Sequence, residues 1–233
     1  MDEIIKKEIE GIYSQISKVD KETQLSDMDA KFDTKTQLKA LTDRIDKLME
    51  EKSCVVVGID GSCTSGKSTL AGWLAEQYDC NVFHMDDYFL RPEQRTAERF
   101  AEPGGNVDRE RFAEEVLLPL MEWKNDGEGH RKDNFSYRPY DCSVQCIGDA
   151  VTVERKKLNI VEGSYSLHPE LEHAYDLKVV LAVNPEVRKE RILKRPEFLH
   201  KRFFEEWIPM EQMYFNSSNI TERCDMILVN IDI

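Results

Sequence analysis

Five short apolar runs recur along the chain, and segments with helical spacing lie between them. The runs cover residues 54–60, 81–87, 158–163, 177–183 and 226–230. Unbroken apolar runs of this length are typical of strands that are buried on both faces. Helical patterns lie at residues 69–77, 108–123 and 185–194. This alternation predicts an α/β fold in which helices cover both faces of a parallel sheet.

The first 50 residues have a different pattern and predict an N-terminal helical extension. Isoleucines recur at helical spacing between Ile4 and Ile16, and residues 17–36 are polar and predict a loop. Apolar positions between Leu38 and Met49 then predict a second amphipathic helix. Both helices are expected to pack on the main domain or on a partner subunit. In the second case the protein would be a homo-oligomer.

Composition and charge restrict the kinds of molecule that the protein is expected to bind. The chain of 233 residues carries a formal net charge of −13, whereas broad binding to nucleic acids depends on a basic surface. The N-terminal segment is charged, unlike a signal peptide, and no apolar run approaches the ~18 residues that cross a bilayer. Six scattered cysteines lack zinc-binding spacing. We therefore expect a cytoplasmic protein that binds neither nucleic acid nor membrane.

A glycine-rich bend follows the first apolar run and fits the pattern G-x-x-x-x-G-K-[ST]. Glycines allow such a loop to turn its backbone N–H groups toward phosphates, and the helix that follows adds its N-terminal dipole. Lys67 can reach phosphate oxygens, and the Ser68 hydroxyl can bind Mg²⁺. A glycine turn that only joins strand to helix would not explain a lysine at a helix start, where a cation opposes the dipole. The predicted ATP-binding residues are Gly61, Ser62, Cys63, Thr64, Ser65, Gly66, Lys67, Ser68 and Thr69.

Acidic residues follow the second and third apolar runs. Asp86 and Asp87 end the second run, and Glu162 ends the third. In doubly wound sheets, functional side chains gather at the carboxyl ends of strands. A carboxylate there can accept the proton of an attacking hydroxyl, and another can hold Mg²⁺ directly or through water. The alternative for Asp86 and Asp87 is a solvated acidic turn or a helix N-cap.

Arginines cluster in the segment after the fourth run. Arg188, Arg191 and Arg195 recur three and four residues apart, which places them along one helix face, and Arg202 follows. Arginines on a mobile segment can close over a triphosphate and stabilise transition-state charge. We therefore predict a lid at about residues 186–205; the alternative is a solvated helix with paired charges.

These motifs together resemble the uridine kinase and phosphoribulokinase-like family of P-loop kinases. The segments that carry the resemblance are "GIDGSCTSGKST", "HMDDYF", "GGNVDRERF", "YDC" and "IVEGSYSLHPEL". The resemblance implies a P-loop kinase domain at residues 51–233, with a parallel five-stranded sheet, an insertion at 134–153 and a lid. It further implies that ATP and Mg²⁺ are used to phosphorylate a hydroxyl group of a small molecule, often a nucleoside.

The resemblance also assigns roles to single residues. Asp86 falls at the family's catalytic carboxylate, and Glu162 at the acidic residue that supports Mg²⁺ with Ser68. Asp108 is similar to the aspartate that binds ribose hydroxyls, and Tyr140 to a tyrosine that contacts the base. Lys67, Arg191 and Arg195 complete the implied catalytic set. The sequence departs from the family at "YDCSVQC", where nucleoside kinases carry a histidine shortly after the Tyr-Asp pair.

The sequence therefore predicts an ATP-dependent kinase whose acceptor is a nucleoside such as uridine or cytidine. Two alternatives remain open at this stage. One is a kinase for a non-nucleoside alcohol, such as a vitamin precursor or a sugar phosphate. The other is a non-catalytic nucleotide-binding regulator, for which the N-terminal extension is the motivating feature.

Overall fold

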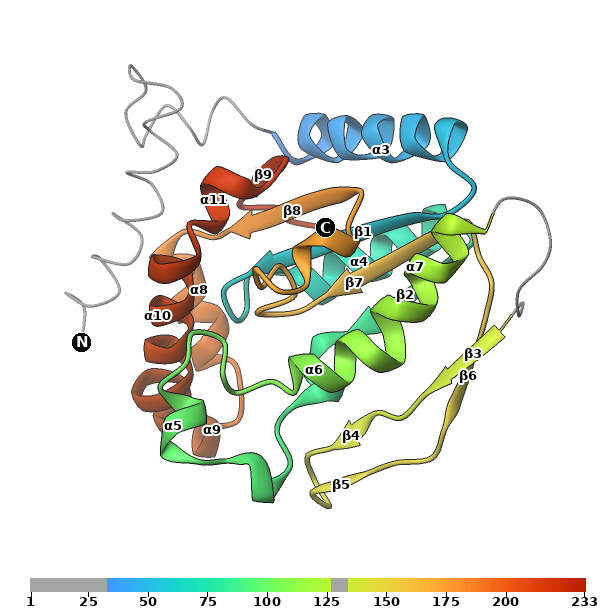
Figure 1. Cartoon of the computed structure of the whole chain (residues 1–233). Coiled ribbons are helices and arrows are strands. Elements are labelled where there is room, and N and C mark those ends of the chain that lie inside the picture. Colours follow the sequence, from blue (N-terminus) through green and yellow to red (C-terminus); the bar gives the residue numbers. More distant parts are fainter. Residues whose placement is uncertain (1–32, 127–133) are drawn as a thin grey trace.

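A five-stranded parallel sheet forms the centre of the molecule (Figure 1). The computed structural model describes residues 33–126 and 134–233. The strand order is β2-β7-β1-β8-β9. The strands are β1 (Val55–Gly61), β2 (Cys80–His84), β7 (Leu158–Glu162), β8 (Leu177–Ala182) and β9 (Met226–Val229). All five predicted strands are confirmed, but the second one ends at His84 because Met85–Tyr88 forms a 3-10 turn.

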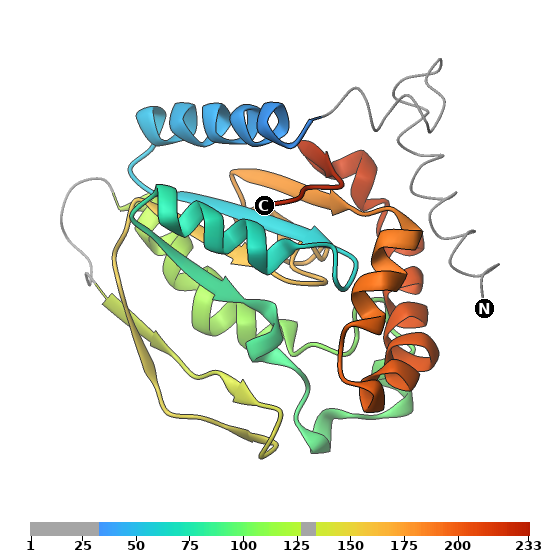
Figure 2. The ribbon, with the colours of Figure 1, turned by 180° about the vertical axis from the view of Figure 1, so that it is seen from behind.

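Two helices cover one face of the sheet (Figure 2). Helix α3 (Thr34–Glu51) contributes Leu41 and Ile45, and α4 (Lys67–Gln77) contributes Leu70 and Leu74, to a cluster with the strands. The predicted amphipathic helix is thus confirmed. The predicted loop is wrong for residues 34–36, because Asp33 caps the helix by accepting the Thr36 N–H at 3.0 Å. The predicted helix at 4–16 and the loop up to residue 32 lie outside the described residues.

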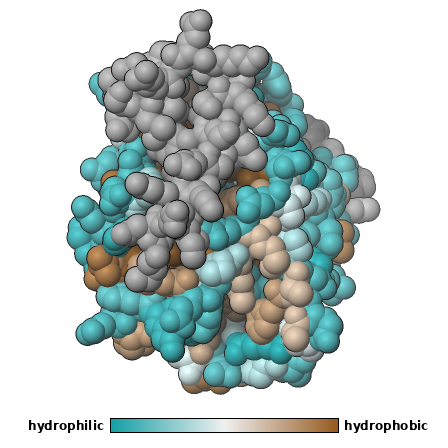
Figure 3. All heavy atoms as spheres, turned by 90° about the vertical axis from the view of Figure 1, so that its left-hand side faces the viewer, coloured by the Kyte–Doolittle hydropathy of each residue, from teal (hydrophilic) through white to brown (hydrophobic). Residues whose placement is uncertain are grey.

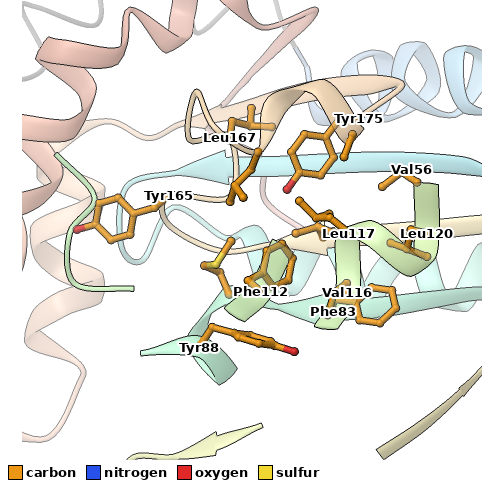
Figure 4. Packing of buried hydrophobic residues seen from close by; sticks show 14 of the residues in the cluster. Val56, Phe83, Tyr88, Phe112, Val116, Leu117, Leu120, Tyr165, Leu167 and Tyr175 are labelled. Carbon is orange, nitrogen blue, oxygen red and sulfur yellow. The ribbon is translucent and has the colours of Figure 1, made fainter. Parts of the chain in front are cut away.

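The opposite face is covered by one long helical segment. It consists of α6 (Arg109–Phe112), a π-helical turn (Ala113–Leu117) and α7 (Leu118–Asn125). Figure 4 shows Phe112, Leu117 and Leu120 of this segment beside Val56 and Phe83 of the sheet. The sequence predicted an uninterrupted helix here. A proline at position 119 cannot donate to the carbonyl four residues back, which accounts for the wider turn before it.

The insertion forms two antiparallel strand pairs (Figure 1). Strand β3 (Asn134–Tyr137) pairs with β6 (Val151–Glu154), and β4 (Tyr140–Asp141) pairs with β5 (Cys146–Ile147). Phe135 stacks on Phe83 of β2, with ring centroids 6.0 Å apart. The insertion therefore shares the hydrophobic core of the sheet face that α6 and α7 cover.

A group of helices lies beyond the carboxyl ends of the strands (Figure 1). It contains α8 (Pro185–Leu193), α9 (Glu197–Arg202), a second π-helical turn (Phe203–Trp207) and α10 (Ile208–Ser218). Ile192, Phe203 and Ile208 form a small separate core between them. The short helices are α5 (Ala97–Phe100), α11 (Ile220–Arg223) and the 3-10 turns Met85–Tyr88, Pro92–Gln94 and Glu172–Ala174.

The surface in Figure 3 is mostly polar and the cysteines are unpaired, in a chain with many charged residues. Figure 3 faces the helices beyond the strand ends, and its coloured surface is mostly hydrophilic with separate hydrophobic areas. In the part of the chain that the structure describes, none of the helices combines the length and the apolar character needed to span a bilayer. The six cysteines are free thiols.

Candidate active site

A cavity of about 930 Å³ lies at the carboxyl ends of the strands. Its walls come from the glycine-rich bend after β1, the loops after β2 and β7, helix α8 and the segment after β9. These elements are far apart in the chain, and the parallel sheet brings them to one edge. Of the predicted ATP-binding residues, Cys63, Thr64, Gly66, Lys67, Ser68 and Thr69 line the cavity.

The two glycines of the bend are required by its geometry. Gly61 has φ +148°, and a Cβ atom there would lie 2.4 Å from the Leu181 carbonyl oxygen of β8. Gly66 has φ +105° and stands directly before α4. Side chains other than hydrogen disfavour both conformations. The glycines thus let the chain pass close to β8 and turn into α4 with its first N–H groups toward the cavity.

Lys67 holds the bend together and lines the cavity. Its ammonium group donates to the carbonyl oxygens of Gly61 (2.8 Å) and Ser62 (2.9 Å), and its side chain is buried. It also reaches the Ser164 hydroxyl at 3.3 Å. A buried ammonium beside free N–H groups makes this end of the cavity attractive to an anion such as a polyphosphate.

Ser68 and Glu162 provide oxygen atoms suited to Mg²⁺. The Ser68 hydroxyl donates to Glu162 Oε1 at 3.0 Å, so the two predicted metal ligands are adjacent. His84 Nδ1 lies 2.6 Å from the same carboxylate oxygen, and this hydrogen bond raises the pKa of His84. Mg²⁺ is usually held by one or two protein oxygens together with phosphates and water. The residues present fit that pattern, and His84 is a neighbour that sequence reasoning missed.

Asp86 faces the cavity, whereas Asp87 is not among the residues that line it. Protein walls around the carboxyl group of Asp86 remove part of its hydration, and this desolvation raises its pKa, against the opposing effect of Lys67. A carboxylate with a raised pKa is a stronger base, which suits proton abstraction from a hydroxyl. The structure therefore distinguishes between the two neighbouring aspartates of the sequence motif.

Arginines of α8 and its neighbours line the opposite wall. Arg191 donates to the carbonyl oxygens of Thr64 (3.1 Å) and Ser65 (3.2 Å) in the bend. Arg195 and Arg202 also line the cavity, and Lys194 joins them. This wall concentrates positive charge beside the bend in a chain that is acidic overall.

Arg188 has a different position from its neighbours in the sequence motif. It is buried, and its guanidinium donates to Glu211 Oε2 of α10 at 2.6 Å. The other oxygen of Glu211 accepts the Cys63 N–H (2.7 Å) and the Ser164 hydroxyl (3.0 Å). Glu211 thus ties α8 and α10 to the bend. Sequence reasoning missed it because an isolated glutamate in a helix gives no signal of its partners.

Asp60 is a second buried carboxylate close to the bend. It accepts the N–H groups of Gly61 (2.6 Å) and Leu167 (2.9 Å) and the Tyr214 hydroxyl (2.8 Å). Complete burial raises the pKa of Asp60 to about 6, although these hydrogen bonds oppose the shift. Asp60 therefore fixes the loop after β7 and helix α10 relative to the end of β1.

Of the three residues predicted to bind the acceptor, Asp86 lines the cavity, and Asp108 and Tyr140 do not. Asp108 caps α6 by accepting the Arg111 N–H (3.2 Å) and also accepts from the Gln94 amide (2.8 Å). Tyr140 is buried, and its hydroxyl accepts from Arg95 at 3.1 Å. Gln94 and Arg95 therefore hold Asp108 and Tyr140 by hydrogen bonds, and Arg95 itself lines the cavity.

Tyr165 and Asn106 also line the cavity. The position of Tyr165 after the third apolar run predicted that it could face the site, whereas Asn106 was not predicted from the sequence. Tyr165 has φ +73°, a left-handed conformation that is uncommon for tyrosine and is often found at functional sites. The Oδ1 atom of Asn106 is buried and lacks a hydrogen-bond partner among the described residues.

Comparisons with known proteins rest on solved structures, since no protein-family model and no curated protein sequence matches the chain. A possible uridine kinase from Bacillus stearothermophilus is 22% identical with a TM-score of 0.56; the match covers 81% of this chain and 99% of that chain. YFH7 from Saccharomyces cerevisiae, a candidate P-loop-containing kinase with a circular permutation, is 12% identical with a TM-score of 0.55. Its match covers 85% of this chain and 99% of that chain.

A candidate fructose transport system kinase from Silicibacter sp. TM1040 is 20% identical with a TM-score of 0.50; 76% of this chain and 90% of that chain are covered. Identities this low establish the fold and leave the substrate open. The protein has the fold of the P-loop kinases. The predicted fold class, a parallel five-stranded sheet between helices, is thereby confirmed.

Proposed function

We propose that this protein is a kinase that transfers the γ-phosphoryl group of MgATP to a hydroxyl group of a small molecule. One observation carries the proposal. The bend with Lys67, the Ser68–Glu162 pair and the carboxylate of Asp86 surround the same cavity, together with Arg191 of α8 and Arg195 after it. These are the groups that phosphoryl transfer needs to position a triphosphate, neutralise its charge and orient an acceptor. The fold of the structural neighbours supports the same reading.

Each side chain has a separate task in the proposed reaction. The N–H groups of the bend and Lys67 bind the phosphates, and Asp86 orients the acceptor hydroxyl and takes its proton. Arg191 and Arg195 stabilise charge on the phosphoryl group and the leaving diphosphate. Mg²⁺, held by Ser68 and Glu162, would neutralise charge shared between the β- and γ-phosphates. Closure of the lid at residues 186–205 would exclude water from the transfer.

A nucleoside such as uridine or cytidine is the proposed acceptor. The sequence motifs and the name of the Bacillus stearothermophilus neighbour support this choice. A non-nucleoside alcohol is the second candidate. It is favoured by the positions of Asp108 and Tyr140 outside the cavity and by the charged Arg95 on its wall.

A panel of acceptors tests the proposal directly. The full chain is incubated with MgATP and with nucleosides, sugar phosphates or vitamin precursors, and ADP release is measured against an acceptor-free control. Release that depends on one acceptor class identifies the substrate. Binding of MgATP with no acceptor-dependent release from any class would instead favour a nucleotide-binding regulator. Absence of MgATP binding by calorimetry would refute both readings.

A further inference from the structure

Helix α3 of the N-terminal extension clamps the end of the edge strand β9. The amide group of Gln37 donates from Nε2 to the Val229 carbonyl oxygen at 3.0 Å, and its Oε1 accepts the Val229 N–H at 2.8 Å. Gln37 is 5% exposed, so both hydrogen bonds are shielded from water. The two bonds resemble one hydrogen-bonded residue pair of a β-sheet, and they form on the side of β9 that faces away from β8.

The segment after β9 is fixed from two further sides. Its Asp232 N–H donates to the Thr34 hydroxyl of α3 at 3.4 Å. The side-chain oxygen of Asn230 accepts the Asn184 N–H at 2.7 Å, and Asn184 in turn caps α8. Residues 231–233 are therefore held between α3 and the helix that carries Arg191. Figure 1 shows β9 beside the N-terminal end of α3.

Residues 231–233 line the cavity. The strand order β2-β7-β1-β8-β9 places Asp86 at one end of the carboxyl edge, the phosphate-binding bend in the middle and this segment at the other end. In the proposed reaction the terminal phosphate points toward Asp86. The rest of the nucleotide must then extend in the opposite direction, toward α8 and residues 231–233.

We propose that Gln37 is a positioning residue of the nucleotide site, which fixes residues 231–233 as the wall against which the nucleoside part of ATP lies. This inference rests on the proposed function, because the direction of the nucleotide is set by the role of Asp86. Ile233 offers exposed apolar surface to the flat face of a base, while the buried Ile231 anchors the segment in the core of the sheet. Helix α3 thereby becomes part of the binding machinery and is more than a cover for the sheet.

Calorimetric titration of the full chain separates this role from a purely structural one. Two magnesium-loaded ligands are used: MgATP, and inorganic tripolyphosphate, which has the phosphates and lacks a nucleoside. The variant is Gln37→Ala. The matched control is Arg44→Ala, because Arg44 also donates from α3 to a backbone oxygen, that of Asp225 at 2.7 Å, but at the start of β9, away from the cavity.

Gln37→Ala is expected to weaken MgATP binding by about threefold to tenfold, the equivalent of one or two lost hydrogen bonds, and to leave tripolyphosphate binding unchanged. Arg44→Ala should change neither affinity. Ile233→Ala, at a partly exposed position without a role in docking α3, should weaken MgATP selectively and remains informative if Gln37→Ala does not fold.

Three results would overturn the inference: unchanged MgATP affinity in Gln37→Ala and Ile233→Ala, equal losses for both ligands, or equal effects of Gln37→Ala and Arg44→Ala. The measurement uses no acceptor. If the inference about Gln37 is wrong and the proposed function is right, the wild type still binds MgATP normally. Failure of the proposed function appears separately, as absent MgATP binding or as absent transfer to any acceptor.

Discussion

At the scale of single residues, Asp86 and Asp87 show how the fold separates two identical neighbours. Only Asp86 lines the cavity, yet desolvation raises the pKa of both carboxyl groups. We expect Asp86→Asn to lower kcat by about 10²-fold or more, because the amide cannot accept the hydroxyl proton. MgATP affinity should change little, since Lys67 and the bend hold the phosphates. Steady-state kinetics with the acceptor found in the panel, together with calorimetry, give both quantities.

Asp87→Asn is the matched control for that substitution, and its kcat should remain close to that of the wild type. Similar losses in the two variants would show that the paired charge matters and that neither aspartate acts alone as the base. Near-normal turnover in Asp86→Asn would remove Asp86 from the catalytic role.

The cysteine in the phosphate-binding bend is predicted to be chemically inert. Burial, together with the nearby Glu211 carboxylate, raises the pKa of Cys63 to about 12. At pH 8 only roughly one thiol in ten thousand would be the reactive thiolate. Iodoacetamide should therefore modify the exposed Cys146 long before Cys63, as measured by mass spectrometry of digested samples taken over time. Modification of both at similar rates would contradict the described environment of Cys63.

Local motifs determined how well single residues could be predicted. The bend is contiguous, so Lys67 and Ser68 could be assigned from sequence alone, and Glu162 and Asp86 followed from their positions near strand ends. Glu211 could not be assigned because its partners are distant in the chain, and Asn106 could not be assigned because it belongs to none of the motifs. The roles of Asp108 and Tyr140 came from resemblance, and the structure places both behind the cavity wall.

At the scale of elements, the Arg188–Glu211 pair joins α8, α10 and the bend into one unit. Both side chains are almost fully buried, at 2% exposure each. Glu211→Ala would remove the carboxylate partner of the buried, charged Arg188, and breaking a buried ion pair in this way typically costs about 3–5 kcal/mol of unfolding free energy. Denaturant unfolding of the wild type and the variant measures this loss.

A double variant, Arg188→Met with Glu211→Leu, removes both charges and should recover much of the lost stability while leaving the Cys63 N–H without its acceptor. We therefore expect its MgATP affinity to stay below that of the wild type. A loss under about 1 kcal/mol in Glu211→Ala would show that the ion pair is dispensable for the packing of these helices.

Element types were predicted better than their internal geometry. Periodicity identified the strands and α3, α4 and α8, because one apolar face suffices to define an amphipathic element. Both π-helical turns were missed. Each lies directly before a helix with proline at its second position, Pro119 and Pro209, so proline within a long helical pattern was the available signal.

At the scale of the whole molecule, the order of the strands brings the residues of the site together. Hydrophobic periodicity alone does not predict that order. β1 pairs with β7 and β8, which lie about a hundred residues further along the chain. The alternation of strands and helices predicted a parallel sheet, and the resemblance supplied its five-stranded form. The arrangement of Asp86, the bend and residues 231–233 along one edge of the sheet could be established only from the structure.

Asp60 makes the stability of this architecture depend on pH. It lies at the end of the central strand and receives hydrogen bonds from the loop after β7 and from Tyr214 of α10. Burial raises its pKa to about 6 from the 3.8 expected in the unfolded chain. The native state therefore binds more protons between these values, so the stabilising contribution of Asp60 is full below pH 3.8 and is lost as the pH rises through 6.

The variant Asp60→Asn removes this titration, so the difference in unfolding free energy between wild type and variant isolates it. From pH 4 to pH 7 the wild type should lose about 2.4 kcal/mol relative to the variant, because most of the difference between the two pKa values of Asp60 falls within this window. We expect the variant to be less stable than the wild type, because its amide N–H₂ replaces one of the two carboxylate oxygens and so faces the N–H of Gly61 or that of Leu167, a donor, where Asp60 accepts. Guanidinium unfolding at several pH values measures the difference. A constant difference across this range would show that Asp60 is ionised throughout and that its hydrogen bonds outweigh its burial.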